Sequence, residues 1–287
     1  MKKIFIILPL LFILTFDGCF FMLPDIPSEP ETEYEFPYAT NINGEFVPKH
    51  ENVDESPLDP TLFSLDENGR MIYADDSHTL IHGIDVSVFQ GDIDWNAVKN
   101  DGIDFAILRV GYRGYGSKGI MEIDENFYKN YNGAINAGLD VGVYFYSQAV
   151  NADEAREEAR YVLDAVEDCV LTYPIVYDWE YVNNDSARTK DMTSEQITVC
   201  AEAFCNEIEL AGYNTVIYFN CEIGYFEYDL SKLNTYDFWL AEYNSYPTFL
   251  YDYKMWQYSE KGTVAGIDGP CDLNVSFVDY SMPPVVG

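Results

Sequence analysis

The sequence predicts an α/β barrel with an incomplete helical coat, in which five βα units are followed by three plainer strands. Strand-like and helix-like patterns alternate from Gly83 onward, and runs such as FAILRV (105–110) are almost continuously apolar, as in strands covered on both faces. The last three strand-like runs leave no room for full helices between them. A flat doubly wound sheet is the competing topology, but no GxGxxG fingerprint supports it.

Each expected element has a local signal. Helices are expected to end at Gly102 and Gly138, and two more to begin at the N-x-x-E and T-x-x-Q patterns of Asn151 and Thr193, which resemble capping boxes. The last of these helices should bury one face that includes Ala211. The expected strands are IDVS (84–87), FAILRV (105–110), VGVYFYS (141–147), the start of YPIVYDWEYV (173–182), TVIYFN (215–220), FWLAEY (238–243), YKMWQY (253–258) and DLNVSF (272–277).

Residues 1–19 are typical of an export signal. Lys2 and Lys3 precede a hydrophobic run from Ile4 to Phe16, which is shorter than the roughly 20 residues that a spanning helix needs. Gly18-Cys19 resembles the lipobox of bacterial lipoproteins, in which that cysteine is lipidated, although Phe16 and Asp17 depart from the usual pattern. An uncleaved signal-anchor is the alternative. We therefore expect an exported protein of the cell envelope, held at the membrane through Cys19 or secreted.

Residues 20–82 differ in composition from residues 83–287. This Pro/Glu-rich segment carries 14 acidic residues against 2 basic ones and should act as an extended linker, with its last part packing on the next domain. The domain expected over 83–287 carries 34 acidic residues against 12 basic ones. Nucleic acid is excluded as a partner because no basic stripe is present to neutralise phosphates.

The residue types of 83–287 restrict its chemistry. All three histidines precede Gly83, so Ser-His-Asp catalysis, Cys-His catalysis and imidazole-ligated zinc are not expected there. None of the six cysteines forms a CxxC or zinc-type spacing, and Cys200 and Cys205 fall in a helical pattern that indicates core thiols. We expect neither a metal nor a cofactor, and acid–base work falls to carboxyl groups, Tyr, Lys or Cys.

Carboxyl groups gather at strand ends. Asp178 and Glu180 are two residues apart at the end of one strand and should point the same way, about 6.6 Å apart along the chain. Asp85 lies in the first strand and Asp272 opens the last. In a barrel these ends surround one mouth, where crowded acids raise each other's pKa, so that one can keep a proton while another stays ionised. The alternative is a solvated structural pair bonded to Arg109 or Arg188.

A resemblance covers nearly all of 83–287. The segments GIDVSVFQGDIDWNAVKNDGIDFAILRVGYRGYG, AGLDVGVYFYSQA, YPIVYDWE, VIYFN, FWLAEY and MWQYSEKGTVAGIDGPCDLN together resemble family 25 glycoside hydrolases, the Chalaropsis-type lysozymes. The resemblance implies a modified TIM-like barrel, (β/α)5 followed by three strands, as the catalytic domain. It also implies cleavage of the β-1,4 bond between N-acetylmuramic acid and N-acetylglucosamine in peptidoglycan.

The resemblance also implies roles for single residues. Glu180 would be the general acid and then the base that activates water, and Asp178 would stabilise positive charge at the anomeric carbon. A role for Asp178 as the nucleophile remains an open alternative, but the resemblance favours assistance by the substrate's 2-acetamido group. Either route retains the configuration of the anomeric carbon. Asp85 and Asp272 would tune pKa values and hold substrate. Sugar binding is expected from Tyr146, Tyr218 and Gln257, each of which could equally serve packing.

The expected function is therefore that of a muramidase, acting as a monomer on peptidoglycan glycan strands. One alternative is a non-catalytic glycan-binding lipoprotein on a hydrolase-like barrel, because a fold does not guarantee its chemistry. Another is a hydrolase directed at chitin or a related hexosamine polymer. The sequence does not distinguish self-remodelling from attack on other cells.

Overall fold

The computed structural model describes residues 38–41, 43–75 and 80–282. These described residues belong to one compact unit. The expected export signal 1–19 with Cys19, and the first part of the expected linker, lie outside the described residues, so those expectations stay predictions.

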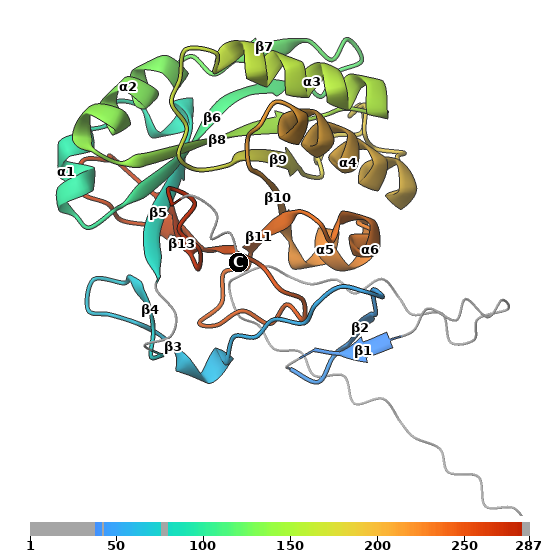
Figure 1. Ribbon diagram of the computed structural model, residues 1–287, viewed down its shortest axis with the longest axis horizontal. Helices are drawn as coiled ribbons and strands as arrows, with labels where there is room; N and C mark the ends of the chain where they lie inside the picture. Colours follow the sequence, from blue (N-terminus) through green and yellow to red (C-terminus); the bar gives the residue numbers. More distant parts are fainter. Residues whose placement is uncertain (1–37, 42, 76–79, 283–287) are drawn as a thin grey trace, which may run out of the picture. The chain divides into compact units, whose positions relative to one another are not determined.

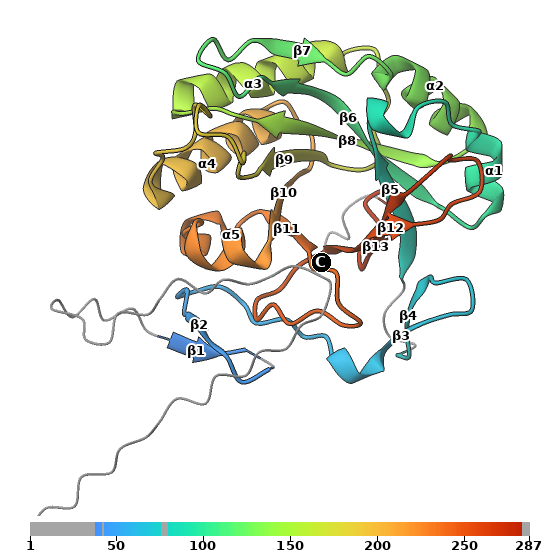
Figure 2. The same ribbon diagram turned by 180° about the vertical axis from the view of Figure 1, so that it is seen from behind.

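Eight strands close into a barrel, which confirms the predicted fold class (Figures 1 and 2). The order around the barrel is β5-β13-β12-β11-β10-β9-β8-β6, and β6 pairs back to β5. A short strand β7 (Met121–Ile123) pairs only with the end of β6. The barrel strands are β5 (Ile81–Val86), β6 (Phe105–Arg113), β8 (Asp140–Ser147), β9 (Ile175–Trp179), β10 (Thr215–Asn220), β11 (Asp237–Ala241), β12 (Met255–Gly262) and β13 (Cys271–Ser276).

The last strand runs against its neighbours. Every other adjacent pair in the barrel is parallel, whereas β13 is antiparallel to both β12 and β5. The beginning of β13 therefore lies where the parallel strands end, and Asp272 is paired in register with Asp85. The reversal brings an acid from the start of one strand to the mouth formed by the ends of the others.

Helices follow the first five barrel strands, as the sequence predicts. They are α1 (Trp95–Asn100), α2 (Phe127–Ala137), α3 (Ala152–Ala165), α4 (Ser194–Leu210) and the pair α5 (Cys221–Phe226) and α6 (Leu230–Leu233). Residues 242–270, all described, contain no helix. Figures 1 and 2 show these helices arching around one side of the barrel. The last three strands therefore need another cover.

The observed helix ends confirm most of the helix starts and ends predicted from the sequence. Thr193 and Gln196 form a capping box at the start of α4, and Gly138 ends α2 in the left-handed conformation that suits glycine. Asn151 caps α3, but the Glu154 carboxylate accepts a hydrogen bond from Val150 N rather than from Asn151 N. The expectation that Ala211 is buried is wrong: it is the exposed C-cap of α4, one residue beyond the packed face.

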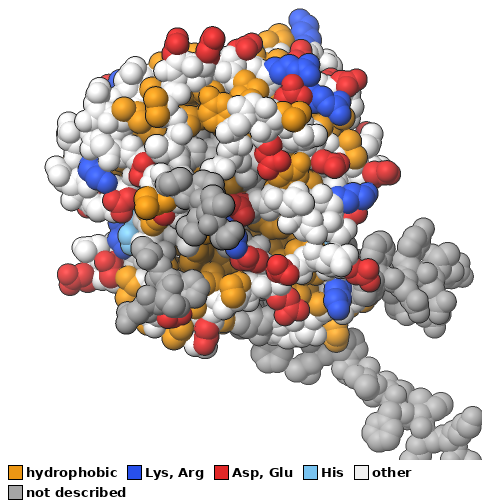
Figure 3. Space-filling model, viewed as in Figure 1, with side chains coloured by type: hydrophobic (Ala, Val, Ile, Leu, Met, Phe, Trp, Pro, Cys, Tyr) orange, Lys and Arg blue, Asp and Glu red, His pale blue; other side chains and the backbone are white. Residues whose placement is uncertain are grey.

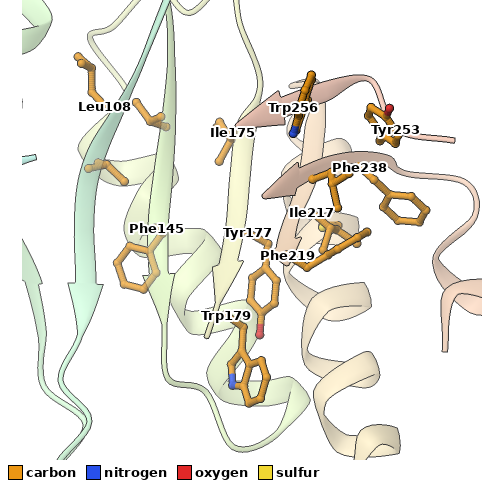
Figure 4. Close-up of a cluster of buried hydrophobic side chains, with 14 of the residues drawn as sticks. Leu108, Phe145, Ile175, Tyr177, Trp179, Ile217, Phe219, Phe238, Tyr253 and Trp256 are labelled. Carbon is orange, nitrogen blue, oxygen red and sulfur yellow. The ribbon is translucent and has the colours of Figure 1, made fainter. Parts of the chain in front are cut away.

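The barrel wall separates two apolar clusters, as strand alternation requires. On β9, Ile175, Tyr177 and Trp179 belong to the larger cluster between the wall and the surrounding elements, part of which Figure 4 shows. Val176 points the other way, into a smaller cluster inside the barrel. Its other buried members are Phe105, Ile107, Tyr173, Val216, Trp239 and Met255. We call this inner cluster the apolar plug of the barrel.

Residues before the barrel cover its helix-free side. We call residues 38–41 and 43–75 the N-terminal strap. It contains β1 (Tyr38–Thr40), β2 (Phe46–Pro48), a 3₁₀ turn (Pro60–Leu62), β3 (Phe63–Leu65) and β4 (Met71–Tyr73). In Figures 1 and 2 the strap lies on the side away from α2 and α3. His50 N donates to the Tyr251 hydroxyl at 2.6 Å, and Ser56 N donates to Leu250 O at 2.9 Å.

The surface is strongly acidic. The whole chain has 49 acidic and 16 basic residues, and Figure 3 shows acidic side chains spread over one face with fewer basic ones among them.

Over the described part of the chain, no helix combines the length and the apolar character needed to span a bilayer.

Phe63 is the apolar anchor of the strap. Its ring is 8% exposed and lies 5.2 Å from the Trp256 ring on β12, 6.1 Å from Phe277 and 4.6 Å from Tyr73, between ring centroids. We expect Phe63→Ala to lower the free energy of unfolding by about 3 kcal/mol, because it leaves a cavity against the barrel wall. Urea denaturation measures the change.

The matched control is Phe46→Ala, which removes a strap phenylalanine that is 78% exposed. It should change the free energy of unfolding by no more than about 0.5 kcal/mol. Equal small losses for both variants would show that the strap does not stabilise the barrel.

Candidate active site

A cavity of about 210 Å³ opens at the end of the barrel where the parallel strands finish. Trp239 belongs both to the apolar plug and to the cavity lining, so the plug forms the cavity floor. The walls are almost entirely acidic or phenolic. The lining residues are Asp85, Tyr144, Asp178, Glu180, Tyr218, Trp239, Tyr243, Gln257, Glu260 and Asp272.

All four acids predicted from the sequence line this cavity. Asp178 is the fourth residue of β9 and Glu180 follows the strand directly, so both keep the inward direction set by Val176. Asp85 comes from β5 and Asp272 from β13, where the antiparallel register sets them side by side. Asp85 and Asp178 are only 7% and 5% exposed. The fold thus brings together groups that lie up to 187 positions apart in the chain.

Asp178 and Glu180 form a hydrogen-bonded carboxyl pair. Burial raises the pKa of Asp178 well above its ordinary value, and the charges of Glu180 and Asp85 add to the rise. Burial and Asp85 also raise the pKa of Glu180, while its hydrogen bond with Asp178 lowers it. Asp178 Oδ1 is buried and has no hydrogen-bond partner. The pair therefore shares a proton at the cavity wall.

Asp85 and Asp272 form a second hydrogen-bonded pair. Burial, Asp85 and Glu260 together raise the pKa of Asp272 to about 8. Burial raises the pKa of Asp85 only to about 6, because hydrogen bonds from Asn274, Gln257 and Asp272 favour its ionised form. Near neutral pH Asp272 therefore keeps a proton and Asp85 is the charged member.

Neither Arg109 nor Arg188 bonds to the acid pair, so that alternative interpretation is wrong. Arg109 forms an ion pair with Asp124 at 2.7 Å, and Arg188 forms one with Glu154, also at 2.7 Å. Arg109 is still close enough to lower the pKa of Asp178. Cations do not hold the two acids away from the cavity.

The predicted sugar-binding residues divide into two groups. Tyr218 and Gln257 line the cavity, and the Tyr218 and Tyr243 hydroxyls donate to Gln257 Oε1 at 2.9 and 2.8 Å. Tyr146 is paired in register with Asp178 but is not among the lining residues. Burial raises the pKa of Tyr146, and the charges of Asp178 and Glu180 add to the rise, so Tyr146 lies near these acids. Its role in sugar binding stays a prediction.

Four lining residues were not predicted. Tyr144 shares a strand face with Tyr146, and Trp239 and Tyr243 alternate along β11 and just beyond it, so a two-residue period could have identified these three. Glu260 could not be found in this way. The pairing of β12 with β13 shifts register twice between Gln257 and Gly262, so simple alternation fails there.

The cavity suits acid–base chemistry on a polar, uncharged ligand. It offers protonated and ionised carboxyl groups side by side, with aromatic rings on which a sugar can pack. Within the described ranges, no three His, Cys, Asp or Glu side chains are arranged to hold a metal ion. The expectation that no metal or cofactor is needed stays a prediction.

Comparison with known proteins agrees with this geometry. The model of the family "Glycosyl hydrolases family 25" matches residues 84–267. The autolytic lysozyme of Clostridium acetobutylicum is 28% identical over 194 residues, which cover 67% of this chain and 54% of that protein. Lysozyme M1 of Streptomyces globisporus is 28% identical over 207 residues, which cover 68% of this chain and 67% of that protein. The match thus spans about half the length of the first relative.

Solved structures share the fold. The modular autolysin LytC of Streptococcus pneumoniae superposes with a TM-score of 0.60 at 25% identity, over 83% of this chain and 56% of LytC. A second LytC structure, in complex with a synthetic peptidoglycan ligand, superposes with a TM-score of 0.58. With the family match covering more than half of the chain and the barrel shared with LytC, this protein belongs to family 25 of the glycosyl hydrolases.

Proposed function

We propose that this protein is a muramidase that cleaves the β-1,4 bond between N-acetylmuramic acid and N-acetylglucosamine in peptidoglycan. The observation that carries the proposal is the hydrogen-bonded pair of Asp178 and Glu180 inside a cavity lined by aromatic rings. Membership of family 25 and the lysozyme names of the relatives support the same substrate. The complex of LytC with a peptidoglycan ligand supports glycan binding at this fold.

Substrate would decide which acid holds the shared proton. Asp178 lines the cavity, and an acetamido N–H of the substrate is a donor that could bond to its carboxylate. A donor at Asp178 favours its ionised form, so the proton moves to Glu180. Glu180 is then the acid and Asp178 the anion, as hydrolysis of a glycoside requires.

Cleavage then proceeds in two steps. Glu180 donates its proton to the glycosidic oxygen as the bond from that oxygen to the anomeric carbon breaks. The acetamido carbonyl oxygen bonds to the anomeric carbon, and Asp178 stabilises the resulting oxazolinium cation through its N–H. Water next attacks the anomeric carbon, and the Glu180 carboxylate takes a proton from this water. The oxazolinium ring opens and restores the acetamido group.

Two inversions at the anomeric carbon leave its configuration retained. The contact between the two carboxyl groups supports retention, because inverting enzymes hold their acids about 6.5–9.5 Å apart to admit a water between them. Direct attack by Asp178 would also retain configuration. The resemblance to family 25 favours acetamido assistance, in which Asp178 stabilises the oxazolinium cation without forming a bond to carbon.

The acid pair gives the first prediction for activity. Glu180→Gln and Asp178→Asn should each lower kcat for peptidoglycan by about 10³-fold or more, with glycan binding retained, because each removes a group used mainly in the transition state. Release of reducing ends measures the rate, and co-sedimentation with sacculi measures binding. Asp153→Asn, which neutralises an acid whose side chain is 96% exposed, is the matched control and should keep full activity.

Mass spectrometry of a sacculus digest identifies the bond that is cut. Fragments ending in reducing muramic acid are expected. The absence of any product from the unaltered protein would favour a glycan-binding role instead, and cleavage of chitooligosaccharides alone would favour a hexosamine polymer as substrate. Full activity in Glu180→Gln would place the acid elsewhere.

Net charge gives a second prediction. The chain carries a formal charge of −33, so it is repelled by walls that bear anionic polymers. Hydrolysis of such walls should rise severalfold from about 10 mM to about 150 mM salt, as the screening length falls from roughly 30 to 8 Å. Turbidity clearing measures the rate. Walls stripped of their anionic polymers are the control, and an equal rise on both substrates would contradict an electrostatic cause.

We further propose export and attachment to the membrane through lipidated Cys19, on the sequence pattern of residues 1–19 alone. Cells expressing the full chain should incorporate labelled palmitate into this protein, and globomycin should block its maturation. Cys19→Ser is the control and should carry no label. An unlabelled, membrane-bound wild-type protein would point to an uncleaved signal-anchor instead.

A further inference from the structure

Asn274 is a fully buried amide next to the cavity but not part of its lining. It lies on β13, two residues after Asp272 and paired in register with Gly83 of β5. Its Nδ2 donates to Asp85 Oδ2 at 2.7 Å, and its Oδ1 accepts from Trp239 Nε1 at 3.0 Å. The amide thus bridges Trp239 in the cavity floor and Asp85 in the cavity wall.

The orientation of this amide is fixed by chemistry. An indole Nε1–H can only donate, so the Asn274 carbonyl oxygen must face Trp239 and the amide N–H₂ must face Asp85. The reverse orientation would bring two donors together at Trp239 and two acceptors together at Asp85. A fixed donor at this distance favours the ionised form of the carboxyl group that it meets.

We propose that Asn274 is a positioning residue that, together with Gln257, holds Asp85 ionised at the centre of the acid cluster. Gln257 Nε2 donates to the same oxygen, Asp85 Oδ2, at 2.8 Å. Its own carbonyl oxygen is engaged by the Tyr218 and Tyr243 hydroxyls, which orient it as Trp239 orients Asn274. Two independently oriented amides therefore converge on one carboxylate oxygen.

The surroundings of Asp85 otherwise oppose its charge. Four other carboxyl groups line the same cavity as Asp85 and face Asp85 or the groups next to it. They are Asp272 on β13, Glu260 on β12, and Asp178 and Glu180 at the end of β9. The phenols of Tyr144, Tyr218 and Tyr243 and the Cys271 thiol are neutral neighbours whose pKa values Asp85 raises. Arg109 acts on Asp178 and is paired with Asp124.

The charge of Asp85 has a consequence for the reacting pair. It raises the pKa values of both Asp178 and Glu180, so it helps the pair to keep its shared proton. If Asp85 became protonated, the pKa of Glu180 would fall and Glu180 would lose its proton at lower pH. Asn274 thereby acts on catalysis only through Asp85. The effect of Asp85 on catalysis by the reacting pair rests on the proposed function, whereas the effect of Asn274 on Asp85 does not.

The test is Asn274→Leu, which keeps the branched shape of the side chain at a larger volume and removes its donor. The Asp85 midpoint is followed in the full chain by NMR of ¹³C-carboxyl-labelled aspartate, and Asp85→Asn identifies its resonance. We expect the midpoint to rise by about one pH unit, the loss of one hydrogen bond to a charged group. On peptidoglycan, the alkaline limb of the pH–rate profile should move to lower pH, kcat should fall, and KM should change less than about twofold.

Asn130→Leu is the matched control, because Asn130 is 1% exposed and lies on α2, outside the barrel wall. It should lower stability and leave both the Asp85 midpoint and the pH–rate profile unchanged. If Asn274→Leu does not fold, Gln257→Met removes the other donor and should raise the same midpoint.

An unchanged Asp85 midpoint in Asn274→Leu, or an equal shift in Asn130→Leu, would overturn the proposal. A wild-type protein inactive on peptidoglycan would instead overturn the proposed function, and the NMR midpoints would still decide the role of Asn274.

Discussion

Crowding of like charges is the constraint on which the rest of this structure depends. Five carboxyl groups line one cavity of about 210 Å³, and the four of Asp85, Asp178, Glu180 and Asp272 cannot all be ionised together at so short a range. The structure resolves this by forming two hydrogen-bonded pairs, Asp178 with Glu180 and Asp85 with Asp272. Each pair holds a proton that one of its members would otherwise release near neutral pH. Because these carboxyl groups are confined together, they can act as acid and base, and no histidine is needed.

The barrel confines these acids. An apolar plug that includes Val176, Met255 and Trp239 blocks the interior below the acids, so burial acts on them from beneath. The reversed strand β13 then completes the ring and sets Asp272 beside Asp85. A parallel last strand would place its first residues at the opposite end of the barrel. The direction of one strand therefore decides whether the second carboxyl pair can form.

The sequence was sufficient for features that depend on local periodicity. Alternation along one strand predicted that Asp178 and Glu180 point together, and alternating strand and helix patterns predicted five βα units and three further strands. The shifts of register in β12 broke that alternation and hid Glu260. Asn274 was hidden for another reason: its importance comes from Trp239 and Asp85, which lie on other strands. The packing of Phe63 on Trp256 and Phe277 likewise joins segments whose relation no local pattern reveals.

The strap also determines the order in which the chain can fold. His50 meets Tyr251 across 201 positions, and Asp85 meets Asn274 across 189. During synthesis the strap and β5 are made well before these partners. Pairing across such separations is entropically costly and slow. Ring closure must therefore wait until β13 has been made, so β5 lacks one of its two strand partners until then.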